Sequence, residues 1–175
     1  MIANRYEPLE VTPAGAAVKA RDMQTAQTVM LRPITRLDER LCGLFHPALV
    51  TIFDIVRDGR ATYAACEFVQ GRSLRLIMGG QPFNSRRACE IVAEVADGVA
   101  ELHARDIFHG AITIDTVLLT TKGKSKLDLV HAIGSSEPVD VDQLRGLYTA
   151  LVGPGQPAID AAGSAAVLAA SLRSP

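Results

Sequence analysis

The segment from residue 85 to residue 105 constrains the fold of this chain more than any other. Its apolar residues recur every three or four positions and form one stripe, made of Ala88, Ile91, Val92, Val95, Val99 and Leu102. That spacing is typical of an amphipathic α-helix, which must bury its apolar face against other elements. Asn84 or Ser85 can cap the helix, because a short polar side chain accepts a hydrogen bond from a backbone N–H of the first turn.

The chain before this helix predicts strands and one short helix. Residues 6–32 read as strands, and two later apolar runs flank the turn Arg57-Asp58-Gly59, which indicates a hairpin. The expected strands cover residues 16–20, 28–31, 49–56 and 61–69. A short helix is expected over residues 34–45, because their apolar members would share one helical face. These members are Ile34, Leu37, Leu41 and Leu44.

The chain after residue 72 predicts mostly helices around one small hairpin. The hairpin strands are expected over residues 117–121 and 125–130, joined by Lys122-Gly123-Lys124. The expected helices cover residues 73–78 and 139–152, with a weak alanine-rich helix within 158–175. Strands followed by helices indicate an α+β fold in two lobes.

Composition and charge exclude several classes of protein. The chain has 175 residues, of which 48% are apolar, so it can build a domain core and is not globally disordered. Its net charge of −1 predicts no nucleic-acid partner. No run reaches the roughly 20 apolar residues of a membrane span, so no direct insertion into a membrane is expected. Cys42, Cys66 and Cys89 have apolar neighbours and are expected to be small buried residues of a cytoplasmic protein.

Several segments resemble the motifs of eukaryotic-type protein kinases, in the style of the bacterial serine/threonine enzymes. They are Val29-Met30-Leu31-Arg32 (V-A-I-K), His46-Pro47-Ala48-Leu49-Val50 (H-P-N-I-V), Glu67-Phe68-Val69-Gln70-Gly71 (E-y-v-x-G), His109-Gly110-Ala111 (H-R-D) and Asp140-Val141-Asp142-Gln143-Leu144 (D-v-y-s-L). Their shared order between Tyr6 and Val152 carries the resemblance, since no single segment is specific. The resemblance implies a protein-kinase-like two-lobed fold, with a small β-rich N-lobe and a reduced helical C-lobe.

The same resemblance implies how the chain is organised. Residues 1–175 would form one domain, with the N-lobe and its short regulatory helix over 1–69, the reduced C-lobe over 70–152, and an alanine-rich tail over 153–175. Only residues 132–139 separate the second hairpin strand from the next helix, where the family places a much longer activation segment. The ending Ser174-Pro175 is consistent with a cut in a longer chain, of which this segment would be a cytosolic part.

The positions that transfer a phosphoryl group in the family carry other residues here. The transfer requires that metal ions are held and that the attacking hydroxyl is positioned. The replaced positions are Arg32 for the V-A-I-K lysine, Ala111 for the catalytic base, Thr116 for the metal-binding Asn and Leu129 for the D-F-G aspartate. Asp128 lies one residue early, which in a strand points a side chain to the opposite face. No catalytic residue and no metal ligand is therefore expected.

The nucleotide pocket implied by the resemblance is degenerate as well. In register with Val18, the three glycines of the phosphate loop fall on Val11, Pro13 and Ala16, and proline has no N–H to offer a phosphate. Met30 would partly fill the adenine space between Val18 and Leu118. No cofactor is therefore expected.

A structural spine is expected in place of the active site. It would consist of Leu41, His109, Val130 and Asp140, with the Asp140 carboxylate accepting hydrogen bonds from the backbone of residues 109–111. Glu101 and His103, at the end of the long helix, are expected to be solvated. His46 is expected to fix a turn.

These features favour a non-catalytic pseudokinase that acts as a protein-interaction or regulatory scaffold. Because later C-lobe helices are missing, the exposed helical face of the C-lobe is expected to bind a protein partner or a second copy. One alternative is a nucleotide-binding switch that keeps Arg32 and the hinge Glu67–Val69 but transfers no phosphate. Another is an atypical phosphotransferase that uses a displaced acid, Asp115 or Asp128.

Overall fold

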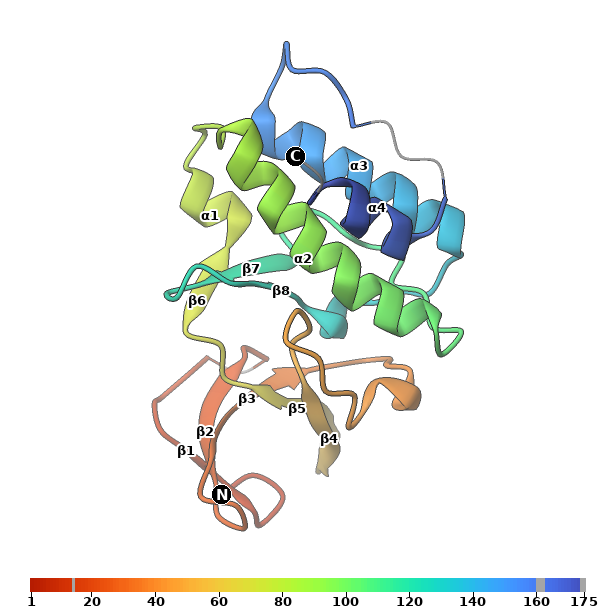
Figure 1. Ribbon diagram of the computed structural model, residues 1–175. Helices are drawn as coiled ribbons and strands as arrows, with labels where there is room; N and C mark the ends of the chain where they lie inside the picture. Colours follow the sequence, from red (N-terminus) through yellow and green to blue (C-terminus); the bar gives the residue numbers. More distant parts are fainter. Residues whose placement is uncertain (14, 160–162, 174–175) are drawn as a thin grey trace. The chain divides into compact units, whose positions relative to one another are not determined.

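The chain divides into two compact units in a computed structural model that describes residues 1–13, 15–159 and 163–173 (Figure 1). The first unit consists of Met1–Phe45 and Val50–Val69, and the second of His46–Leu49 and Gln70–Pro175. The division after Val69 coincides with the expected lobe boundary. Residues 46–49 belong to the second unit rather than to the N-lobe, and the described part of the 153–175 tail belongs to that unit too.

The first unit is a five-stranded antiparallel sheet with the order β1-β2-β3-β5-β4. The strands are β1 (Tyr6–Pro8), β2 (Val18–Asp22), β3 (Thr28–Pro33), β4 (Ile52–Asp58) and β5 (Ala61–Glu67). Alternate residues of β3, Val29 and Leu31, point into a core with Tyr6 and Ala65, as the period of two in a strand requires. The predicted hairpin of residues 49–69 is confirmed as β4 and β5, although β4 begins at Ile52 and continues to Asp58.

An ion pair between the half-buried Arg5 and the buried Asp22 joins the two open ends of the hairpin formed by β1 and β2. Asp22 is 3% exposed and accepts hydrogen bonds from Arg5 Nε at 2.9 Å and Arg5 Nη2 at 2.7 Å. Its carboxylate also accepts from the Gln24 N–H at 2.9 Å and the Thr25 hydroxyl at 3.0 Å. The bond with Arg5, together with these neighbours, holds the pKa of Asp22 well below its usual range.

Asp22→Asn is expected to lower the free energy of unfolding at pH 7 by about 2 kcal/mol, because the guanidinium of Arg5 loses its buried charged acceptor and keeps only the more exposed Asp54. Since the pKa of Asp22 is lower in the folded state, its stabilisation is complete above the unfolded value of about 3.9 and is lost as the pH falls through the folded value. Urea unfolding at pH 7 and below pH 4 should therefore show a difference between wild type and variant that shrinks with acid. The exposed Glu7→Gln on β1 is the control, and a difference that stays constant with pH would contradict this account.

The helix expected over residues 34–45 is wrong. Only one 3-10 turn forms, η1 (Glu39–Leu41), and Asp38 caps it by accepting from the Arg40 N–H at 3.0 Å. Gly43 then adopts a φ of 73° and donates its N–H to the Ile52 carbonyl at 2.8 Å. Because of this bond to β4, the segment does not continue as a helix. The spacing of its apolar residues alone could not indicate such a long-range contact.

In its described residues, the second unit contains a three-stranded sheet and four α-helices, which Figure 1 labels. The strands are β6 (Gly71–Ser73), β7 (Val117–Thr120) and β8 (Ser125–Leu127), and the helices are α1 (Leu74–Met78), α2 (Ser85–His103), α3 (Glu137–Val152) and α4 (Ala165–Ser171). The long helix is confirmed as α2, and Asn84 caps it by accepting from the Arg87 N–H at 2.9 Å. The second hairpin strand ends at Leu127 rather than at residue 130, because the chain turns into a 3-10 turn, η2 (Leu129–His131).

The apolar face expected on the C-lobe helices is largely covered. Every apolar residue of the α2 stripe is buried, and α4 packs mainly against α2 and also against α3. The predicted weak helix in the tail is confirmed as α4, whereas residues 160–162 and 174–175 lie outside the described part. The apolar stripe of α2 is therefore covered within the unit, and the binding of a partner to the C-lobe helices stays a prediction.

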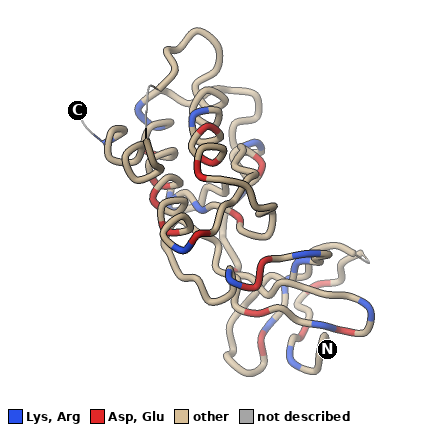
Figure 2. Tube along the Cα trace, turned by 90° about the vertical axis from the view of Figure 1, so that its right-hand side faces the viewer, with Lys and Arg blue, Asp and Glu red and all other residues tan. Residues whose placement is uncertain are grey.

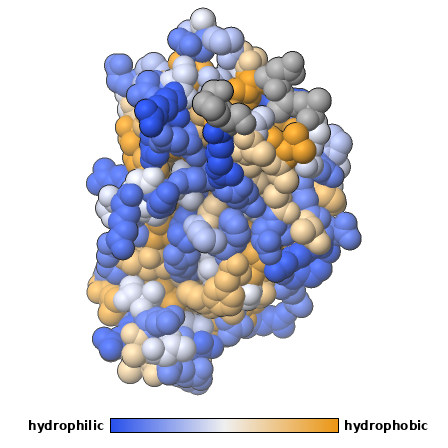
Figure 3. All heavy atoms as spheres, in the orientation of Figure 1, coloured by the Kyte–Doolittle hydropathy of each residue, from blue (hydrophilic) through white to orange (hydrophobic). Residues whose placement is uncertain are grey.

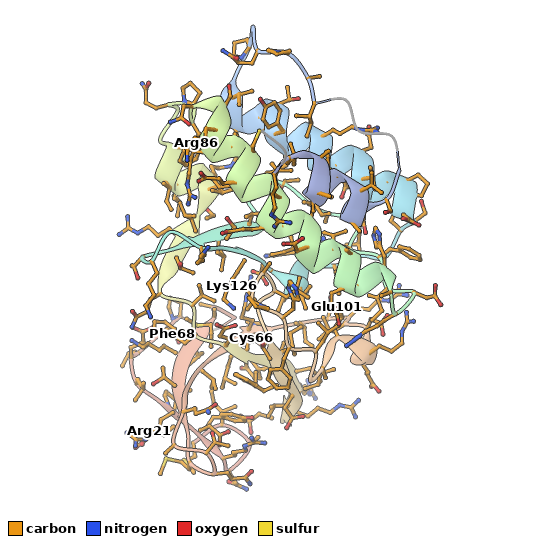
Figure 4. The ribbon with its side chains drawn as sticks, viewed as in Figure 1. Arg21, Cys66, Phe68, Arg86, Glu101 and Lys126 are labelled. Atoms are coloured by element: carbon orange, nitrogen blue, oxygen red, sulfur yellow. The ribbon has the colours of Figure 1, made fainter. Side chains whose placement is uncertain are left out.

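Charges and cysteines complete the description of the two units. Basic and acidic residues are interspersed in both (Figure 2), and none of the described helices is both long and apolar enough to cross a membrane. Cys66 lies inside the first unit on β5 and is 1% exposed (Figure 4), which confirms the prediction for this residue. Cys42 and Cys89 are only half-buried.

Candidate functional site

The loop between α2 and β7 is built around one buried carboxylate. Asp140, on α3, is fully buried and accepts hydrogen bonds from the His109 N–H at 2.9 Å and the Gly110 N–H at 2.7 Å. These two bonds confirm the prediction that Asp140 holds the backbone of residues 109–111. A carboxylate without contact to water needs such donors to offset its lost hydration.

The prediction that His103 is a solvated helix end is wrong. Its side chain is 9% exposed, and its Nε2 lies 2.8 Å from Asp140 Oδ2. The ring also packs against Phe108 with 5.3 Å between ring centroids. Since α3 follows more than thirty residues later, only the fold brings this acceptor to the end of α2. Glu101, in contrast, pairs at the surface with Arg105 at 2.7 Å.

A second side chain of α3 holds the same loop and was missed from the sequence. Gln143 accepts a hydrogen bond from the Ile112 N–H at 2.8 Å and donates from Nε2 to the Gly110 carbonyl at 2.8 Å. Gln143 lies three residues after Asp140, and residues at this spacing share one face of a helix. That spacing is the signal in the sequence that could have pointed to Gln143.

His109 has a packing role in this loop. It is fully buried, its Nδ1 accepts from the Ala111 N–H at 3.2 Å, and its Nε2 lies 3.0 Å from the Asp128 carbonyl. Burial lowers the pKa of His109, which favours the neutral ring. A neutral ring with Nδ1 as acceptor donates from Nε2, so Nδ1 is engaged within the loop and Nε2 is engaged at Asp128 after β8.

The hydroxyl at the family's metal-binding Asn position closes a turn of the loop. Thr116 donates from Oγ1 to the Ala111 carbonyl at 2.7 Å and accepts from the Thr113 N–H at 2.9 Å. Ala111 itself is half-buried and presents only a methyl group. Neither residue therefore offers a free acid, amide or hydroxyl at this point of the loop.

Three positions near the hairpin of β7 and β8 carry an acid either here or in the family, and their surroundings differ. Leu129, at the D-F-G position, is fully buried, and Asp128 before it is 3% exposed and accepts from the Val130 N–H at 3.2 Å. Asp115 is exposed and accepts hydrogen bonds from two nitrogens of the Arg75 guanidinium, Nε to Oδ1 and Nη2 to Oδ2, the latter at 2.6 Å. This ion pair lowers the pKa of Asp115.

The segment after η2 packs directly on the loop. Ile133 donates its N–H to the His109 carbonyl at 2.9 Å, and a Cβ at Gly110 would lie 2.8 Å from the Gly134 carbonyl oxygen. Gly110 also has a φ of 74°. In the family this middle position of H-R-D holds an arginine, whereas here the shortened segment leaves no space for any side chain.

The first unit separates two residues that were predicted to share the nucleotide pocket. Val18 lies opposite Leu31 and points into the core, whereas Met30 lies opposite Lys19 and Cys66. Because directly opposed residues share a face and neighbours along a strand do not, Val18 and Met30 face opposite sides of the sheet. Lys19 occupies the position expected for Val18, and the glycine positions then move to Thr12, Ala14 and Ala17, none of which is a glycine.

The remaining predicted residues are divided between the units. Arg32 is half-buried on β3, and Leu41 is buried in η1 of the first unit, whereas Leu118 and Val130 are half-buried in the second. A spine through Leu41, His109, Val130 and Asp140 stays a prediction. His46 accepts from the Ala48 N–H at 3.1 Å, which confirms that it fixes a turn. Among the described residues, no group of three or more His, Cys, Asp or Glu side chains is placed to hold a metal ion.

Comparison with known proteins places this arrangement in a family. Residues 8–130 match the family model for protein tyrosine and serine/threonine kinases. The chain is 32% identical over 115 residues to serine/threonine-protein kinase shk2 of Schizosaccharomyces pombe, covering 63% of this chain and 19% of that protein. It is 26% identical over 117 residues to pkn2 of Myxococcus xanthus, covering 67% of this chain and 14% of that kinase. It is 34% identical over 84 residues to serine/threonine-protein kinase PkaB of Streptomyces coelicolor, covering 47% of this chain and 20% of that kinase.

The matches therefore span a fifth or less of the relatives' own length. The match to the family model covers parts of both units, from the last residue of β1 to η2. Because the matched model covers well over half of the residues, the chain belongs to the protein tyrosine and serine/threonine kinase family.

Proposed function

We propose that this chain is a non-catalytic member of the family and works as a protein-interaction or regulatory module. The observation that carries the proposal is Ala111 at the position of the catalytic base, because a methyl group cannot accept the proton of an attacking hydroxyl. The relatives are named as serine/threonine-protein kinases, so the proposed non-catalytic role differs from the activity in their names.

The residues at the metal positions do not fit the ATP-bound metal ions that the family uses. Metal ions bridging phosphates prefer carboxylate and amide oxygens. Leu129 is apolar and fully buried, and the hydroxyl of Thr116 is bound to two backbone groups of its own loop. Neither position therefore offers a ligand for an ATP-bound metal ion in this chain.

A nucleotide-binding switch without transfer is the second candidate, favoured by one observation. Arg32 keeps a positive charge on β3 where the family has lysine. The planar guanidinium of Arg32 differs in geometry from the ammonium of a lysine, and Met30, on the same face of β3, adds bulk beside it. A thermal-shift titration with ATP, with and without Mg²⁺, tests the switch, since a ligand that binds only the folded state raises the melting temperature. We expect no rise, and a dose-dependent rise lost in Arg32→Ala would favour the switch over the module.

An atypical phosphotransferase using Asp115 or Asp128 is the third candidate. Asp115 is occupied by Arg75, and the Asp128 carboxylate accepts a backbone N–H of its own turn. Both arrangements favour structural roles. Incubation of the chain with γ-labelled ATP, Mg²⁺ or Mn²⁺, and casein or histone tests the proposal directly, and the expected incorporation does not exceed that of a sample without protein.

A further inference from the structure

The second unit contains a cavity on the outer side of α2, apart from the loop of residues 109–116. Its volume is about 960 Å³, and all of its lining residues belong to this unit. They come from the segment 46–48, from α2, from Lys124 and Ser125 at the start of β8, and from Leu172 and Arg173 at the end of α4. Sites for small molecules typically enclose roughly 300–1,000 Å³, so the cavity has the size of a ligand site.

Small side chains leave this space open. The segment 46–49 approaches α2 closely at Gly98, where an added Cβ would lie 2.8 Å from Leu49 Cδ2. Nearer the start of the helix, Cys89 and Ala93 lie one turn apart and line the cavity without filling it. The rest of the apolar lining consists of Pro47, Ala48 and Leu172. A floor of this kind suits the apolar body of a ligand.

The charged residues of the lining neutralise one another. Acids and cations are equal in number, and Figure 3 shows hydrophilic residues at the surface along α2. The ion pairs are Arg86–Glu90 at 3.5 Å, Lys124–Glu94 at 2.9 Å and Arg173–Asp97 at 3.0 Å. Arg87, outside the lining, also binds Glu90, at 3.0 Å. Because every acid and cation of the described lining is paired, an ionised ligand would lose hydration without gaining a counter-ion.

The hydroxyl of Ser125 is the polar group of the lining that stays unbonded. Ser125 is 2% exposed, and its Oγ has no hydrogen-bond partner among the described residues. Its N–H donates to Glu94 Oε2 at 2.8 Å. Burial raises the pKa of Glu94, but Lys124 and both groups of Ser125 outweigh it, so the hydroxyl lies near this carboxylate without forming a bond. A buried hydroxyl without a partner costs free energy, which a ligand that accepts its hydrogen bond would recover.

His46 brings a second donor to the lining. Its Nδ1 accepts from the Ala48 N–H at 3.1 Å, so the ring carries its proton on Nε2. The ring is half-buried and lines the cavity. An imidazole N–H and a hydroxyl can both donate to a carbonyl oxygen, so the lining favours a ligand with an acceptor.

We propose that this cavity binds an uncharged small molecule with an apolar body and a hydrogen-bond acceptor, such as a ketone or an amide. The apolar body would lie on Cys89 and Ala93, and the acceptor would take the hydroxyl of Ser125. This inference goes beyond the proposed function. No residue of the 109–116 loop is among the described residues that line the cavity, so either proposal can fail alone.

The test is a titration of the whole chain with Prodan, a neutral naphthyl ketone whose fluorescence reports an apolar environment. We expect saturable binding of one molecule per chain. The anionic anilinonaphthalene sulfonate should bind at least about tenfold more weakly, because its charge finds no counter-ion in the cavity. Amide chemical shifts should change on Prodan binding for residues 86–97, 124–125 and 172–173.

Three variants locate the bound probe. Cys89→Trp should fill the cavity and weaken Prodan binding at least about tenfold. Cys42→Trp, at the half-buried cysteine of the first unit, is the matched control and should bind like the wild type. Ser125→Ala should weaken binding about threefold to tenfold without lowering stability, since the hydroxyl has no bond to lose.

Circular dichroism of each variant checks that it is folded, and the shift map of the wild type locates the probe without any substitution. Three results would overturn the proposal: no saturable binding of Prodan, shift changes confined to other residues, or equal binding of the neutral and the anionic probe. Prodan binding that a folded Cys89→Trp chain keeps unchanged would overturn it as well.

Discussion

Asp140→Ala is expected to lower the free energy of unfolding of the second unit by about 3 kcal/mol or more, a large part of the 5–15 kcal/mol typical of a domain. The carboxylate is fully buried and accepts from the backbone of His109 and Gly110 and contacts the ring of His103. Alanine would leave these three groups buried without an acceptor. Urea unfolding followed by circular dichroism measures the effect.

Asp142→Ala is the matched control for this substitution. Asp142 lies on the same helix, two residues away, but is exposed, so its removal should change stability by no more than about 0.5 kcal/mol. If the two variants unfold at the same urea concentration, the carboxylate of Asp140 does not organise the loop.

Gly110→Ala is expected to cost about 3 kcal/mol, from left-handed backbone strain and from overlap with the segment after η2. The new Cβ would lie 2.8 Å from the Gly134 carbonyl oxygen and 2.9 Å from Ser135 Cβ, and neither can yield without moving the backbone. Thermal unfolding should show a clear decrease in melting temperature. The same contacts mean that restoring the family's arginine at this position would displace residues 133–135.

Gly123→Ala separates the strain from the overlap. Gly123 has a φ of 76°, close to the 74° of Gly110, but its new Cβ would meet only the flexible end of Arg87 at 3.6 Å. It should therefore cost only about 1 kcal/mol. Equal losses in the two alanine variants would show that residues 133–135 do not restrict the loop.

The sequence predicts what depends on local pattern and motif order. The stripe and cap of α2 fixed that helix, and the D-v-y-s-L resemblance placed Asp140 at the loop. Long-range contacts could not be predicted from the sequence. The hydrogen bond between Gly43 and Ile52 forms where a helix was expected, and α3 packs against His103 and buries it. The alignment with the family motifs was one residue out of register at β2, so Val18 was expected on the face of Met30. Successive residues of a strand point to opposite faces, and Lys19 is the residue on that face.

Labelled phosphoryl transfer tests most directly whether the chain lacks kinase activity, as we propose. Wild type, Asp128→Asn and Asp115→Asn are incubated with γ-labelled ATP and Mg²⁺ or Mn²⁺, with and without casein, beside an active kinase as positive control. We expect all three chains to give the same incorporation as a blank. Incorporation by the wild type that disappears in Asp128→Asn or Asp115→Asn would contradict the account and identify that carboxylate as catalytic.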